Sequence, residues 1–134
     1  MNILLDTHVA IWAMTDDKRL SKRARDIMLD PGNNIYYSAA SVLEVEMKSR
    51  SKKNNLEFDV DEFVQVCHMS GYIHAPLQES HILGVRQLEW QGDGEEHKDP
   101  VDRILLSQAI TDNMRFMTAD SKIPLFKQDC VISI

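Results

Sequence analysis

The sequence is poor in cysteine, has no long apolar run and carries no excess of positive charge. Its two cysteines, Cys67 and Cys130, lack a CxxC spacing, so reduced thiols are favoured over a disulfide or a zinc site. No run approaches the roughly 18 consecutive apolar residues of a membrane span. The chain starts with a strand-like segment at residues 3–5 rather than a secretion signal. We therefore expect a cytoplasmic protein with no membrane partner.

Acidic residues outnumber basic ones. Lys and Arg total 15, Asp and Glu total 21, and the formal net charge is −6. This balance argues against nucleic-acid binding through a global basic field. A local basic patch is present at Lys48, Arg50, Lys52 and Lys53. The same run equally suits a solvated helix C-terminus, where cations complement the helix dipole.

Strand-like and helix-like segments alternate along the 134 residues. A chain of this size is expected to form a single domain over residues 1–134. The patterns predict strands at 2–5, 35–38, 72–74, 115–118 and 131–134, and helices at 8–14, 21–29, 39–51, 59–69, 78–88 and 100–113. Such alternation is typical of an α/β domain whose mainly parallel central sheet is covered on both faces.

Two aspartates stand three residues apart at the start of the apolar helix predicted at 100–113. Asp99 suits the N-cap, Pro100 suits the first helical position, and Asp102 falls in the first turn, where the helix dipole favours a carboxylate. These local rules explain both carboxylates without any function.

Three further acids occupy similar junctions far apart in the sequence. Asp6 follows the first strand, Glu44 lies early in the helix after the second strand, and Asp120 follows the strand at 115–118. Functional groups in parallel α/β folds collect beyond the carboxyl ends of the strands, so we expect all five acids at one edge of the sheet. Each acid also suits a local capping role. Glu44 discriminates best, because it lies beyond either candidate cap, Ser38 or Ser41.

Clustered carboxylates predict a divalent cation. Two ionised carboxylates 4 Å apart repel by about 1 kcal/mol in water and by several-fold more when partly buried. Oxygen ligands without cysteine favour Mg²⁺ or Mn²⁺ over zinc. The five histidines show no ligand spacing, so surface or packing roles are expected for them. A hard cation that polarises phosphoryl oxygens and activates water points to phosphodiester hydrolysis.

Four sequence blocks, in this order, resemble PIN-domain ribonucleases, and most closely the VapC-type toxins of type II toxin–antitoxin modules. The blocks are Ile3-Leu4-Leu5-Asp6-Thr7-His8, Ser38-Ala39-Ala40-Ser41-Val42-Leu43-Glu44-Val45, His97-Lys98-Asp99-Pro100-Val101-Asp102-Arg103-Ile104-Leu105 and Met117-Thr118-Ala119-Asp120. Together they span nearly the whole chain, which makes the resemblance specific.

The resemblance implies a three-layer α/β/α domain and a Mg²⁺- or Mn²⁺-dependent endoribonuclease that is blocked by a cognate antitoxin and forms a homodimer. By position, the family's acidic quartet corresponds to Asp6, Glu44, Asp102 and Asp120. Asp6 and Asp102 are expected to contact the metal directly, and the other two to act through water or on the nucleophile. Auxiliary roles fall to Asp99, Thr7 and Thr118, and RNA contacts to Lys48, Arg50, Lys52, Lys53 and Arg103.

Two alternatives stay open at this point. One is a catalytically weak PIN fold that serves as a protein- or RNA-binding module. The other is a receiver-like α/β domain whose acids bind Mg²⁺ for aspartyl phosphorylation. A receiver needs paired acids after its first strand, and this chain has only Asp6 there.

Overall fold

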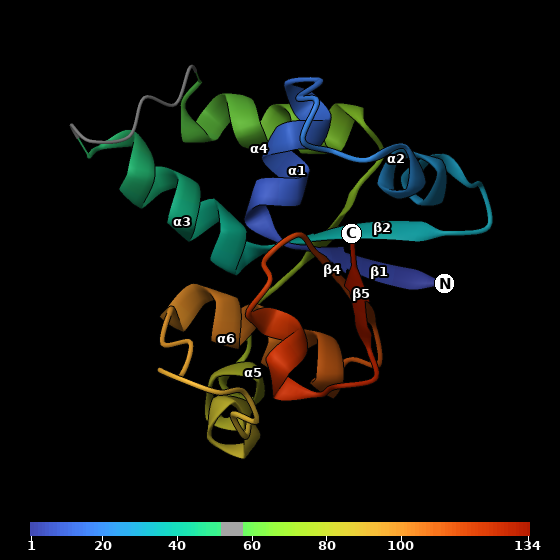
Figure 1. Ribbon diagram of the computed structural model, residues 1–134. Helices are drawn as coiled ribbons and strands as arrows, with labels where there is room; N and C mark the ends of the chain where they lie inside the picture. The colour runs from blue at the N-terminus through green and yellow to red at the C-terminus, as the bar shows by residue number, and fades with distance from the viewer. Residues whose placement is uncertain (52–57) are drawn as a thin grey trace.

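The computed structural model describes residues 1–51 and 58–134, and a parallel β-sheet forms its centre. The described strands are β1 (Asn2–Leu5), β2 (Asn34–Ser38), β3 (Ile73–Ala75), β4 (Arg115–Thr118) and β5 (Val131–Ser133). They are arranged in the order β3-β2-β1-β4-β5 (Figure 1). All four pairings are parallel, which confirms the predicted α/β class.

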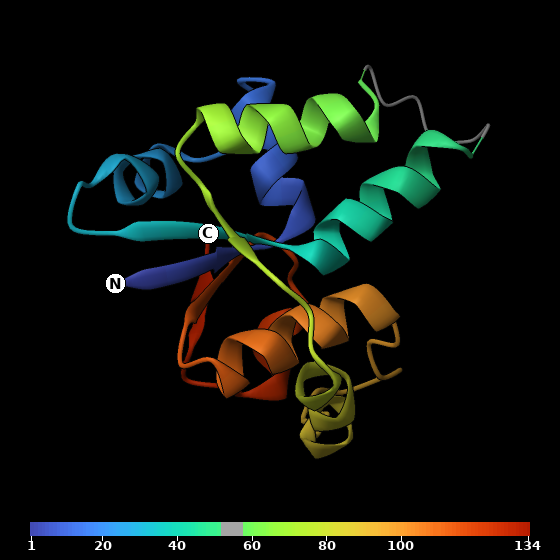
Figure 2. The same cartoon turned by 180° about the vertical axis from the view of Figure 1, so that it is seen from behind.

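Helices cover both faces of the sheet. The described α-helices are α1 (Thr7–Met14), α2 (Lys22–Leu29), α3 (Ala39–Ser49), α4 (Val60–Met69), α5 (Glu79–Leu83) and α6 (Pro100–Thr111). Helices α1, α2 and α4 lie on one side of the sheet and α5 and α6 on the other (Figures 1 and 2). Among the described helices, none has the length and hydropathy needed to cross a bilayer.

The alternation of side chains along β1 explains the three layers. Ile3 and Leu5 pack in the core on the α1 and α4 side, whereas Leu4 packs in the core that contains α6. All three side chains are fully buried, because both faces of a parallel sheet are covered by helices. Helix α3 contributes to both layers, through Val45 on one side and Ala40 on the other.

The N-cap of α3 resolves the choice between Ser38 and Ser41. The Ser38 Oγ accepts a hydrogen bond from the Ala40 backbone N–H at 3.0 Å, so Ser38 rather than Ser41 is the cap of this helix. Ser41 lies inside the helix and is buried. This start places Glu44 in the second turn of α3, on a face that is covered by the rest of the protein.

The helix predicted at 78–88 is shorter than expected. Helix α5 ends at Leu83 and is followed by a 3₁₀ turn, η1 (Gly84–Gln87). A β-carbon at Gly84 would lie 2.5 Å from the Ser107 Oγ of α6, so a glycine is needed for the close approach. Glycine is also a poor residue for a helix interior. A second 3₁₀ turn, η2 (Ile123–Phe126), follows β4.

Candidate metal centre

Asp102 is the acid that connects the other members of the site. It lies in the first turn of α6 and is only 8% exposed. One group of potential ligand atoms consists of His97, Asp102 and Asp120, and a second consists of Glu44, Asp99 and Asp102. Within each group the ligand atoms all lie within 4.8 Å of one another. The structure thus gathers acids from α3, from the start of α6 and from the segment after β4.

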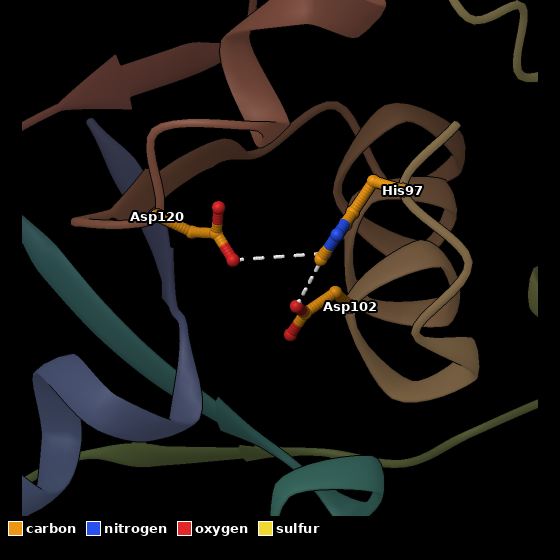
Figure 3. Close-up of side chains that lie close together, drawn as sticks. All are labelled: His97, Asp102 and Asp120. Carbon is orange, nitrogen blue, oxygen red and sulfur yellow. Dashed lines mark hydrogen bonds and ion pairs between the residues drawn. The ribbon is translucent and has the colours of Figure 1, made fainter. Parts of the chain in front are cut away.

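The first group is centred on an imidazole nitrogen. The Nε2 atom of His97 lies 2.8 Å from Oδ2 of Asp102 and 3.6 Å from Oδ2 of Asp120. Figure 3 shows the two carboxylates converging on the ring from opposite elements, α6 and the segment after β4. The His97 side chain is 13% exposed, so this ring is enclosed by the site rather than free on the surface.

In the second group, Asp99 has the helix-capping role predicted from the sequence. Its Oδ1 accepts hydrogen bonds from the backbone N–H groups of Val101 and Asp102, at 3.0 and 3.1 Å. These bonds fix the first turn of α6. Pro100 occupies the expected position at the helix start. The cap therefore positions Asp102, and its own carboxylate lies close to Glu44 and Asp102.

Asp6 is the most buried of the acids, with 2% exposure. Its Oδ2 accepts a hydrogen bond from the Thr118 hydroxyl at 2.6 Å. The same hydroxyl oxygen accepts the backbone N–H of Asp120 at 3.0 Å, so Thr118 links two of the predicted acids. Across the part of the chain that the structure describes, the Asp6 Oδ1 has no hydrogen-bond partner. A buried carboxylate oxygen without a partner is costly.

The Thr7 side chain contacts helix α3. Its hydroxyl donates to the Ser41 Oγ at 2.8 Å rather than to one of the acids. This buried bond ties the start of α1 to α3, the helix that carries Glu44. Thr7 therefore supports the site by holding two of its helices together.

Burial and mutual repulsion raise the pKa values of two acids. Burial is the main cause that raises the pKa of Asp102 to about 7, with the nearby Asp6 charge adding to the rise and the His97 hydrogen bond opposing it. Burial also raises the pKa of Asp6, against the hydrogen bond from Thr118. A divalent cation would relieve both penalties, because it offsets the negative charge and provides a partner for the free Asp6 oxygen. The residues present thus fit a hard cation.

The basic residues that were predicted to contact RNA fall into three groups. Lys48 lies beside the acids, with its Nζ 3.2 Å from Oε1 of Glu44. Arg50 pairs with Glu46, and Arg103 pairs with Glu96 at 3.3 Å. Lys52 and Lys53 lie outside the described residues. Of the three candidates that the structure describes, Lys48 is the one that directly contacts an acid of the site.

His97 is the member of the site that sequence reasoning missed. The pattern of histidines indicated only surface or packing roles. That expectation suits His81. Its side chain is 1% exposed, and its Nε2 lies 2.9 Å from Oδ1 of Asp112. It does not suit His97. The only sequence signal was its position in the block that leads to Asp102, because the loop path that brings it to Asp120 is a tertiary feature.

Comparison with known proteins supports the fold. The PIN domain family model matches residues 3–128. No curated protein matches the chain. Among solved structures, VapBC2 from Rickettsia felis, bound to a DNA fragment from their promoter, aligns over 100% of this chain and 98% of that chain, with a TM-score of 0.67 and 18% identity.

Two further structures are similar over almost the whole chain. VapBC-1 from nontypeable Haemophilus influenzae has a TM-score of 0.58 and 16% identity, and the alignment covers 95% of this chain and 91% of that chain. FitAcB from Neisseria gonorrhoeae has a TM-score of 0.57 and 18% identity, with 98% and 96% covered. At these identities the three structures establish a shared fold.

Proposed function

The chain belongs to the PIN-domain family, and from this premise we propose that it is a metal-dependent endoribonuclease. It would hydrolyse RNA phosphodiester bonds as the toxin of a toxin–antitoxin pair. The observation that carries the proposal is the buried Asp6 carboxylate. One of its oxygens is held by Thr118 and the other has no partner within the described ranges. A metal ligand explains this arrangement better than a structural role does.

The acids of the proposed quartet would hold Mg²⁺ or Mn²⁺. When bound, such an ion supplies charge neutralisation at the phosphate and activation of water. Asp6 and Asp102 are the proposed direct ligands, since both are deeply buried. Glu44 and Asp120 are proposed to act through water or on the nucleophile. Thr118 fixes the orientation of Asp6, because its hydroxyl donates to one carboxylate oxygen.

The Lys48 ammonium is the proposed contact for an RNA phosphate. It pairs with Glu44, and its side chain keeps 29% exposure. A lysine at the rim of an acidic cluster provides positive charge where a polyanionic substrate must approach. Arg50 and Arg103 are proposed as additional contacts.

The proposed partner is a cognate antitoxin. This proposal draws on the similarity to VapBC2 from Rickettsia felis and FitAcB from Neisseria gonorrhoeae. The resemblance also supports a homodimer. Both assemblies can be tested by co-purification with the product of a small neighbouring gene and by measuring the molar mass in solution.

The test of the activity uses purified chain without antitoxin. We expect RNA cleavage with Mg²⁺ or Mn²⁺, and loss of cleavage in Asp6→Asn and in Asp102→Asn while the fold is kept. Asp61→Asn, on the exposed side of α4, is the matched control and should cleave normally. Cleavage retained by either site variant would refute the assignment. No cleavage of any RNA, together with no metal-induced thermal shift, would favour the binding-module alternative.

A further inference from the structure

We propose that His97 binds the metal directly through Nε2, and that this nitrogen ligand makes the centre prefer Mn²⁺ over Mg²⁺. The inference rests on the metal centre of the proposed function but does not require RNA to be the substrate. It adds an imidazole to a site for which the sequence indicated oxygen ligands alone.

The spacing of the ligand atoms supports this role. In an octahedral site with ligands about 2.1 Å from the metal, neighbouring ligand atoms lie about 3.0 Å apart and opposite ones about 4.2 Å apart. The Nε2 of His97 lies 2.8 Å from the Asp102 oxygen and 3.6 Å from the Asp120 oxygen. Both distances fall close to this range, so the three atoms can share one ion after small adjustments. Figure 3 shows the carboxylates of Asp102 and Asp120 both lying beside the same end of the His97 ring.

A second observation indicates that a cation belongs here. The Asp6 Oδ1 is buried and has no hydrogen-bond partner in the described part of the chain. Asp6 is close enough to Asp102 for its charge to raise the pKa of that carboxyl. This free oxygen is independent of the His97 contacts, and Asp6 lies outside both groups of ligand atoms that come within 4.8 Å of one another. Its link to the centre is the charge that it places near Asp102, which a cation bound at Asp102 would offset.

The loop that carries His97 is anchored at two points that precede this residue in the sequence. Before it, the backbone N–H of Gln91 donates to the Leu125 carbonyl at 3.1 Å, and the Trp90 ring packs edge-on against Phe126. Next to it, Glu96 pairs with Arg103 of α6. A loop held in this way presents its imidazole at a defined position, as a metal ligand requires.

The nitrogen ligand determines the metal preference. Mg²⁺ strongly favours oxygen ligands and keeps its waters. First-row transition ions accept imidazole more readily, and Mn²⁺ also suits carboxylates. A set of one imidazole with several carboxylates therefore suits Mn²⁺ better than Mg²⁺. An alternative role for His97 is a hydrogen bond to Asp102 alone, in which the ring only positions that carboxylate.

The experiment compares metal binding by the full chain without RNA. Mn²⁺ affinity is measured by titration followed by electron paramagnetic resonance, and Mg²⁺ affinity is measured by calorimetry. Pulsed electron paramagnetic resonance of the Mn²⁺ complex detects nitrogen that is coordinated to the metal. In His97→Gln we expect the Mn²⁺ dissociation constant to rise by about tenfold or more, with a much smaller change for Mg²⁺. The nitrogen signal should be present in the unmodified protein and absent from the variant.

His8→Gln is the matched control, because the His8 charge lowers the pKa of Asp6 and its ring lies near the site. It should keep the nitrogen signal. Absence of that signal from the unmodified protein would overturn the proposal, even if His97→Gln fails to fold. Equal losses for Mn²⁺ and Mg²⁺ would also overturn it, because they indicate a positioning role. His97-dependent Mn²⁺ binding without RNA cleavage would support this inference and refute the ribonuclease.

Discussion

The Thr118 hydroxyl donates to Oδ2 of Asp6 at 2.6 Å and joins the end of β4 to the end of β1. Both residues are almost completely buried. The hydroxyl is the group that sets the direction of the Asp6 carboxylate. Removing a group that orients a metal ligand typically reduces metal affinity or activity by about 10- to 100-fold.

The first prediction concerns this hydroxyl. Thr118→Val keeps the shape of the side chain but removes the hydrogen bond to Asp6 and the acceptor for the Asp120 N–H. We expect metal affinity and RNA cleavage to fall by about 10- to 100-fold, as measured by calorimetry and by a cleavage assay. Thr118→Ser retains the hydroxyl and should stay close to normal. Unchanged affinity in the valine variant would show that the bond has only a structural role.

The second prediction concerns pH. The pKa of Asp102 is raised from 3.8 to about 7, so between these values the folded state binds more protons than the unfolded state. The free energy of unfolding of the metal-free protein should therefore fall as pH rises from about 4 to about 7, by an amount on the order of 3 kcal/mol. The raised pKa of Asp6 acts in the same direction. Denaturant unfolding at pH 5 and pH 8 measures the difference.

Asp102→Asn is the control for this pH effect. It removes the titrating group and should be more stable than the unmodified protein at pH 8, with a smaller difference at pH 5. Adding Mn²⁺ at pH 8 should stabilise the unmodified protein much more than the variant. Equal pH profiles for the two proteins would show that Asp102 does not cause the dependence. Asp17, whose pKa is lowered to about 2 by Arg19, titrates below this range.

The third prediction concerns a buried amide in α6. The Gln108 Oε1 accepts the Ser38 hydroxyl at 2.6 Å, and its Nε2 donates to the carbonyls of Ala75 and Pro76. Gln108→Ala would leave a cavity and remove these bonds, so we expect a loss of about 2–4 kcal/mol in the free energy of unfolding. Urea unfolding measures it. The exposed Gln65→Ala in α4 is the control, and a similar small effect in both variants would contradict the prediction.

The fourth prediction concerns Lys48. Lys48→Ala removes a cation beside Glu44 and should weaken RNA binding, reducing the slope of log affinity against log salt by about 0.7 to 1. Fluorescence anisotropy in an Asp102→Asn background measures binding without cleavage. Lys22→Ala is the control, because Lys22 forms a pair of the same i,i+4 spacing with Asp26 on α2, but both of these side chains are exposed. Equal slopes in both variants would exclude Lys48 from the RNA contact.

The local features at the start of α6 and along β1 were predicted correctly. The Asp99 cap, the proline at the start of α6 and the position of Asp102 in the first turn all follow from a short stretch of sequence. The buried β1 strand and its parallel neighbours follow from apolar runs that alternate with helices. Local rules are sufficient here because the contacts that decide these features lie within a few residues.

Three features that depend on distant contacts were not predicted. His97 reaches Asp120 because its loop is anchored to η2 and α6, and no local pattern encodes that path. Gln108 has no exposure, although a polar residue in a helix is expected to face solvent. Its partners come from β2 and from the segment after β3. The end of α5 at Leu83 likewise depends on contact with Ser107.

The pairing of β1 with β4 has a consequence for the synthesis of the protein. Asp6 and Thr118 are 112 residues apart, so Asp6 is translated long before the hydroxyl that orients it. Contacts between such distant segments form only when both have left the ribosome. A nascent chain that still lacks β4 therefore cannot assemble the proposed metal centre. Each newly made chain would gain the proposed nuclease activity only when its own translation is nearly complete.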